Sequence, residues 1–237
     1  MLHVLMKKLF LVAPIGLIAI SVSAADADAK AEVNAAARQL ADKPNYSWTS
    51  TPKSEGTGAN LRQGPLEGWA EKGGFAYCKL TVNDNNIETA FKGTKSAIKR
   101  EAVWESADEL EGDNAWIASR LRAFKLPPQE AADLLTKTGE LKKGDDGLYS
   151  GDLTAEGVKE IISRWRRGQS TPTGAKGWVK FWVKDGLLTK YEFNVQGKVT
   201  SGDDQREIEI NRTATIEIKD VGSTRVSVPE EAKKKLS

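Results

Sequence analysis

Few residues of this chain are of the types that perform chemistry in proteins. Its 237 residues include a single histidine, His3, and a single cysteine, Cys78. Because His3 lies in a segment that we expect to be removed, the mature chain cannot build a Ser-His-Asp or Cys-His nucleophile system, or a zinc site of the usual composition. In "GFAYCKLTV", Cys78 alternates with Ala76, Leu80 and Val82 on one strand face, which predicts a buried thiol that acts as a small hydrophobic group.

Carboxylate pairs are the remaining chemistry that needs neither histidine nor cysteine, as in glycoside hydrolysis. The acidic residues of this chain lie mostly at turns or on the polar faces of predicted strands. We therefore expect no catalytic residue, no cofactor and no metal site, and we do not expect an enzyme.

The first residues have the parts of a secretory signal peptide. Lys7 and Lys8 precede an uncharged run at residues 9–23, and small residues at 22–24 match the pattern that signal peptidase reads. The apolar part is shorter than the roughly 20 residues that a bilayer span needs. We expect a signal peptide at residues 1–24, cleaved near Ala24, and a soluble periplasmic or secreted protein that does not span the membrane.

The charge balance argues against nucleic acid as a partner. The chain has 35 basic and 33 acidic residues, and removal of Lys7 and Lys8 leaves 33 of each. Nucleic-acid binding normally requires a basic excess or stripe, and the local basic runs at 164–167 and 233–235 are typical of solvated helix ends. One cysteine cannot form an internal disulfide, so residues 25–237 are expected to form a single domain held by its hydrophobic core.

The order of predicted elements indicates a mainly antiparallel α+β domain, because it contains no regular strand–helix–strand alternation. An Ala-rich helix over 27–42 precedes several hairpins. Between 106 and 135, Trp116, Ile117, Leu121 and Phe124 have helical spacing, and Pro127-Pro128 divides the segment into two short helices. A hairpin near 140–153 is followed by a helix that Thr154 can cap.

The last third of the sequence predicts a hairpin and one long strand. Asp185-Gly186 is a strong turn signal between two alternating strands, and "EIEINRTATIEIK" continues the alternation, with Arg212 interrupting its apolar side. Trp178 and Trp182 fall on the polar side, where their rings can lie along lysine side chains and cover the sheet. The alternative, more specific role for these rings is a sugar-binding platform. The apolar sides supply the candidate ligand-lining residues Val179, Phe181, Val183, Tyr191, Phe193, Ile208, Ile210 and Ile216.

Three segments resemble the LolA/LolB-like lipoprotein-carrier superfamily, which includes LppX-like and RseB-like domains. They are "AFKGTKSAIKREAVWESADEL", "VKFWVKDGLLTKYEFNV" and "RTATIEIKDVGSTRVSVPEEAKKKL". The resemblance implies a strongly curved antiparallel sheet, forming half a barrel, with helices packed on its concave face. It also implies binding of an acyl chain, a lipid or a lipidated protein between sheet and helices, on the apolar residues named above. The alternative is a periplasmic interaction or scaffold module with a filled core, an envelope protein as partner and no small-molecule ligand.

Overall fold

The protein is built on one long, curved antiparallel sheet. The computed structural model describes residues 22–55, 63–82, 85–165, 170–200 and 206–237, so His3 and most of the predicted signal peptide lie outside the described residues. The strands are β1 (Asn45–Glu55), β2 (Gln63–Glu71), β3 (Phe75–Val82), β4 (Asn85–Lys92), β5 (Lys95–Arg100), β6 (Val103–Ser106), β7 (Thr138–Lys143), β8 (Leu148–Leu153), β9 (Thr173–Lys184), β10 (Leu187–Thr200) and β11 (Glu207–Lys219).

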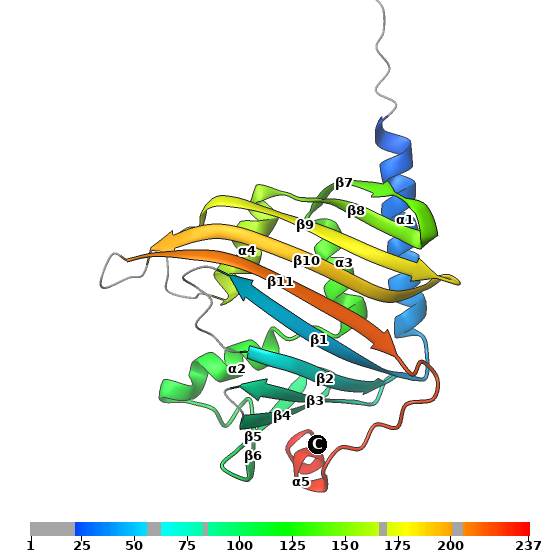
Figure 1. Ribbon diagram of the computed structural model, residues 1–237. Helices are drawn as coiled ribbons and strands as arrows, with labels where there is room; N and C mark the ends of the chain where they lie inside the picture. The colour runs from blue at the N-terminus through cyan, green and yellow to red at the C-terminus, as the bar shows by residue number, and fades with distance from the viewer. Residues whose placement is uncertain (1–21, 56–62, 83–84, 166–169, 201–205) are drawn as a thin grey trace, which may run out of the picture.

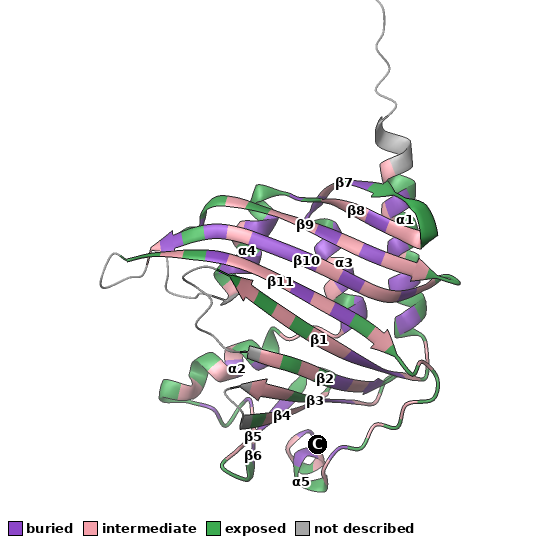
Figure 2. Cartoon of the chain, viewed as in Figure 1, coloured by how far each residue is buried: buried purple, intermediate pink, exposed green. Residues whose placement is uncertain are grey.

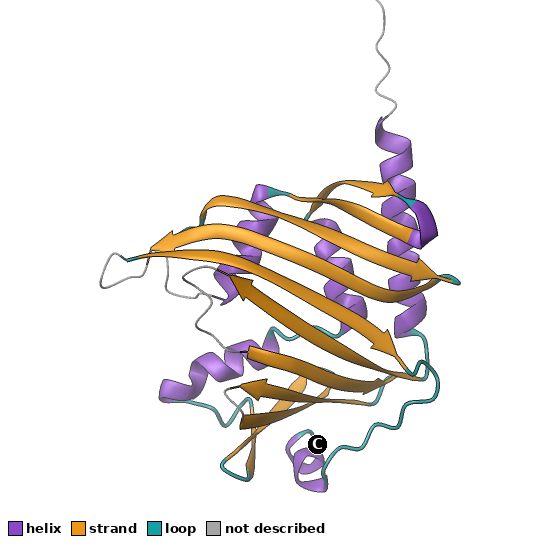
Figure 3. Cartoon of the chain, in the orientation of Figure 1, coloured by secondary structure: helices purple, strands orange, loops and turns teal. Residues whose placement is uncertain are grey.

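The helices fall between and after these strands (Figure 3). They are α1 (Val22–Ala41), α2 (Ala115–Arg122), α3 (Pro127–Thr136), α4 (Ala155–Trp165) and α5 (Glu230–Lys235), with short 3₁₀ turns η2 (Gly112–Asn114) and η3 (Asp145–Gly147). Helix α1 begins at Val22 rather than near Ala27, because the intervening residues contain neither glycine nor proline to stop it.

The strand order is β6-β5-β4-β3-β2-β1-β11-β10-β9-β8-β7. The N-terminal strands form one half of the sheet and the C-terminal strands the other, and the antiparallel pairing of β1 with β11 joins them. Helices α1, α3 and α4 lie behind β7–β11 in Figure 1, and α2 lies behind the other half. The predicted curved, open antiparallel sheet with helices on its concave face is confirmed.

Local sequence signals explain the turns and caps that the fold requires. Asp185 and Gly186 both have positive φ, 51° and 74°, as the tight turn between β9 and β10 demands. Thr154 caps α4 by accepting a hydrogen bond from the Gly157 amide at 3.0 Å. The two prolines predicted to divide the helical segment form the first turn of α3, where a missing amide hydrogen costs little.

The two faces of the sheet have different covers. Along β9, β10 and β11, buried residues alternate with more exposed ones, as Figure 2 shows. Cys78 of β3 faces the main core beneath α1, α3 and α4, whereas its neighbour Tyr77 packs on the opposite, convex face against Val228, Ala232 and Leu236. The C-terminal segment with α5 therefore crosses to the convex face, which the sequence did not indicate.

A candidate ligand-binding face

The eight residues singled out in the sequence lie together on the concave face. Six are buried, and Val183 and Ile208 are partly buried against the same core. The buried ones are Val179, Phe181, Tyr191, Phe193, Ile210 and Ile216. Their side of the sheet is the side that α1, α3 and α4 cover, so the structure brings the predicted residues into one surface.

A continuous row of side chains crosses seven strands on this face. Strand register places Phe181 opposite Tyr191, and Tyr191 opposite Ile216. Directly opposed antiparallel residues point to the same side of a sheet. The row continues from Ile216 through Ser50, Leu66, Leu80 and Ile87, each opposite the next.

Burial changes along this row. Phe181, Tyr191 and Ile216 are at most 2 % exposed, whereas the residues from Ser50 to Ile87 are only half-buried. Leu66, Leu80 and Ile87 were not among the predicted lining residues. Their alternation with polar neighbours is visible in the sequence, but their alignment with Tyr191 depends on the pairing of β1 with β11, which no local pattern reveals.

Side chains fill the space beneath α4 at the buried end of the row. A Cβ atom at Gly177 would lie 3.2 Å from Val158, and one at Gly197 would lie 3.0 Å from Ile162. The two glycines thus allow α4 to pack closely on β9 and β10. This part of the concave face is a packed core as it stands.

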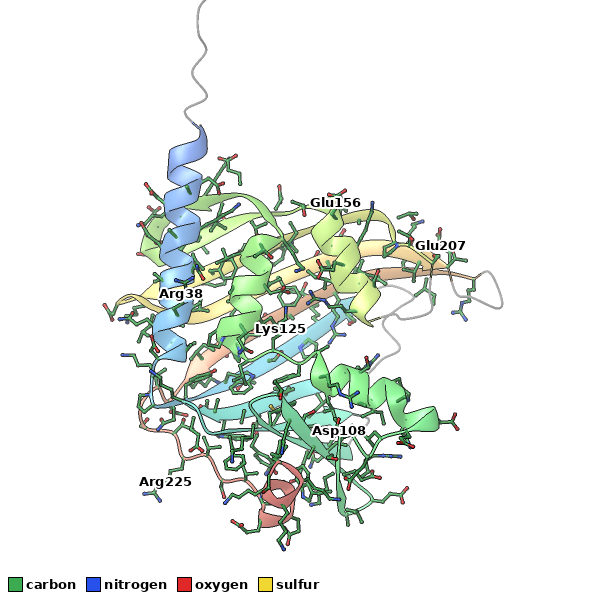
Figure 4. The ribbon with its side chains drawn as sticks, turned by 180° about the vertical axis from the view of Figure 1, so that it is seen from behind. Arg38, Asp108, Lys125, Glu156, Glu207 and Arg225 are labelled. Atoms are coloured by element: carbon green, nitrogen blue, oxygen red, sulfur yellow. The ribbon has the colours of Figure 1, made fainter. Side chains whose placement is uncertain are left out.

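The half-buried end of the row lies near helix α2 and the segment that joins α2 to α3. Helix α2 packs through Ala118 and Leu121 in a smaller cluster that includes Ile98 of β5. The segment between α2 and α3 carries Phe124, whose ring stacks on that of Phe91 with centroids 4.5 Å apart. Both rings are half-buried, as is Leu126. In the rear view of Figure 4, Lys125 marks this segment between the two helices.

A partly buried hydroxyl–carboxyl pair connects the row to α3. The Tyr191 hydroxyl donates a hydrogen bond to a Glu130 carboxylate oxygen at 2.5 Å. Burial raises the pKa of the Glu130 carboxyl, and the negative charge of Asp133 raises it further. Burial also raises the pKa of the Tyr191 hydroxyl. Burial therefore disfavours the charged form of each group, while the hydrogen bond from Tyr191 partly offsets this effect at Glu130.

One turn along α3, Asp133 is the centre of an ion-pair network. Its carboxylate lies 2.7 Å from the Lys125 ammonium, 2.9 Å from that of Lys137 and 3.0 Å from the Arg164 guanidinium. Burial alone would raise the pKa of Asp133, but these three hydrogen bonds outweigh it and hold the pKa well below its usual range. Arg164 belongs to α4, which covers the buried end of the row, and Lys125 belongs to the segment between α2 and α3, which lies over the half-buried end. The network therefore links α4 to that segment through Asp133 of α3.

Cys78 is only 1 % exposed in the main core, which confirms the prediction of a buried thiol. Burial raises its pKa to about 12, far from the range in which a thiolate nucleophile operates. Among the residues that the structure describes, no group of three or more His, Cys, Asp or Glu is arranged to hold a metal ion.

Solved structures similar to this chain share little sequence identity with it. Lipoprotein LppX from Mycobacterium tuberculosis is 13 % identical, with 86 % of this chain and 100 % of that chain covered and a TM-score of 0.49. LprF from Mycobacterium bovis is 11 % identical, with 87 % and 98 % covered and a TM-score of 0.47. A LolA superfamily protein from Nitrosomonas europaea is 9 % identical, with 86 % and 96 % covered and a TM-score of 0.34.

No protein-family model matches the sequence, and no curated protein matches it either. The open sheet with helices in its concavity is nevertheless the architecture that the three sequence segments indicated.

Proposed function

We propose that the protein binds an acyl chain, from a lipid or a lipidated protein, on the concave face of its sheet. The row from Phe181 to Ile87 carries this proposal, because it is apolar along its length except at Ser50 and passes from full burial to half-burial. An extended acyl chain is the ligand whose shape matches a row of this kind. The chain enters over Leu66 and Ile87, below the segment that joins α2 to α3.

The energetics favour such a ligand over a compact polar one. Each methylene group removed from water contributes about 0.8 kcal/mol. The half-buried leucine and isoleucine side chains of the row gain the same kind of stabilisation when a chain covers them. A polar ligand would instead leave its hydrogen-bonding groups without partners on an aliphatic surface.

Opening requires movement of the helical covers, because the buried end is filled. Helix α2 packs in a smaller cluster that meets the core beneath α1, α3 and α4 at Phe91, so its displacement would disturb that core only at its edge. Separation of α3 from the sheet would let a longer ligand reach Tyr191 and Phe181, at the cost of the Tyr191–Glu130 hydrogen bond. The eight residues predicted from the sequence are thus the proposed lining of the deeper part of the site.

Export to the periplasm or the medium is part of the same proposal. No helix within the described part of the chain is long and apolar enough to cross a bilayer. A soluble carrier or sensor of acyl chains in the envelope needs a cleaved signal peptide, which the sequence pattern at residues 1–24 supplies.

A fluorescent fatty-acid probe tests the site, with two glutamine variants on adjacent residues of β2. Leu66→Gln places an amide on the row, whereas Glu67→Gln alters an exposed residue on the other face of the same strand. We expect wild type and Glu67→Gln to bind the probe alike and Leu66→Gln to bind it at least about tenfold more weakly. Equal binding by the two variants would reject the row as the site.

The alternative function is an interaction or scaffold module with no small-molecule ligand. The tight packing of α4 on Gly177 and Gly197 favours it, because that half of the concavity holds side chains. Failure of the wild-type protein to bind any acyl-chain probe would select this alternative.

A further inference from the structure

The convex face of the sheet has a second feature that acyl-chain binding does not use. An open hollow of about 690 Å³ lies over β7, β8 and β9. Its volume is within the range of about 300–1,000 Å³ that is usual for ligand sites. The concave row shares only β9 with this hollow and lies on the opposite face of that strand, so the two features are independent.

Strand register explains how the polar side chains of the hollow come together. Asp152 is opposite Trp178, Ser150 is opposite Lys180, and Lys142 is opposite Ser150. Opposed residues share a face, and Val179, between Trp178 and Lys180, is fully buried on the other one. The indole of Trp178 therefore lies within a group of hydroxyl, carboxylate and ammonium groups on the convex face.

The composition of this hollow selects a class of ligand. Its charged side chains are two acids, Glu140 and Asp152, and two bases, Lys142 and Lys180, so neither an anion nor a cation is favoured overall. The remaining recognition elements are one flat aromatic surface and several hydrogen-bonding groups around it. A pyranose ring matches both, because one of its faces presents C–H groups and its rim carries hydroxyl groups.

The Trp178 ring is accessible to a group approaching from solvent. The Lys180 ammonium lies over it, 4.9 Å from the ring centroid, and the indole is only half-buried. A lysine side chain in that position is flexible and can move aside or donate a hydrogen bond to a bound hydroxyl group. We propose that this hollow is a binding site for a neutral oligosaccharide, with Trp178 as the stacking platform and Asp152 and Lys180 as hydroxyl partners.

The same strand supplies a matched control. Trp182 lies on the same face of β9, is also half-buried, and has the Lys190 ammonium 4.7 Å from its ring centroid. It does not line the hollow. If Trp178 were only an exposed tryptophan beside a lysine, replacing it with alanine would affect sugar binding no more than replacing Trp182.

The test is isothermal titration of the full mature chain with neutral tetrasaccharides, chitotetraose and maltotetraose. We expect at least one of them to bind wild type, Trp178→Ala to weaken that binding about tenfold or more, and Trp182→Ala to leave it unchanged. Asp152→Asn, which preserves shape and removes a charge, should weaken it several-fold. Thermal melting of each variant verifies its fold.

Absence of binding by both sugars, or equal losses in the two tryptophan variants, would overturn the proposal. Acyl-chain binding should be the same in Trp178→Ala as in wild type. Failure of the sugar site would therefore leave the proposed function intact.

Discussion

Removal of the Phe193 ring should be among the most damaging single changes in this protein. The side chain is 4 % exposed on the concave face of β10, between Val179 on β9 and Ala214 on β11. Neither neighbour is large enough to fill the space that Phe193→Ala would leave. Phenylalanine-to-alanine changes in such surroundings cost about 3–5 kcal/mol. We expect Ile210→Ala, at 8 % exposure and opposite Gly197, to fall near the lower end of the 2–5 kcal/mol range.

Urea unfolding monitored by tryptophan fluorescence measures both costs. Lys198→Ala is the control on the same strand, because its exposed side chain on the convex face forms ion pairs with Glu207 and Glu209 and should contribute less than about 1 kcal/mol. The free energy of unfolding should decrease with urea concentration at the same slope in all variants. A loss of less than about 1 kcal/mol for Phe193→Ala would refute the inference that helices and sheet pack tightly at this end of the concave face.

Burial, charge and the N-terminal pattern lead to four further predictions. The Cys78 thiol should react with a maleimide slowly at pH 8 in the folded protein and promptly in denaturant; prompt native labelling would mean that its strand face is exposed. Because the pKa of Glu130 is raised in the folded state, its stabilising contribution is present below its unfolded pKa and lost as pH rises through the folded value, so Glu130→Gln should gain stability relative to wild type as pH increases. Asp133 has a lowered pKa, so Asp133→Asn should be destabilising at neutral pH and progressively less so in acid; parallel stability curves from pH 3 to 8 would contradict both expectations. N-terminal sequencing of exported protein should begin at or near Ala25, and a sequence beginning at Met1 would disprove cleavage.

Short-range signals predicted much of the fold. The turn at Asp185-Gly186, the Thr154 cap and the position of α3 at its two prolines each depend on residues a few positions apart. The burial of Cys78 follows from simple alternation along one strand. The expected packing of tryptophans against lysines is confirmed, since the Lys180 and Lys190 ammonium groups lie over the Trp178 and Trp182 rings.

Long-range contacts account for what the sequence did not reveal. Trp116 was placed in the apolar stripe of its helix, but it is 56 % exposed, with the Arg120 guanidinium 5.1 Å from its ring. Helix α2 is short, and Ala118 and Leu121 are its buried residues, so its rotation is set by the sheet beneath it. On the convex face of β3, Phe75 and Tyr77 are followed by Lys79 and Thr81, so the strand pattern gives no clear signal for a second cover. The packing of the C-terminal segment on that face depends on tertiary contacts.

The central claim is that an acyl chain lies along the row on the concave face. The most direct test is photolabelling of the mature protein with a diazirine-bearing fatty acid, followed by peptide mapping of the adducts. We expect labels on the strand residues Ser50, Leu66, Leu80 and Ile87 and on Phe124 above them, reduced by excess unlabelled fatty acid. Labels confined to the convex face, or labels that excess fatty acid does not reduce, would contradict the account.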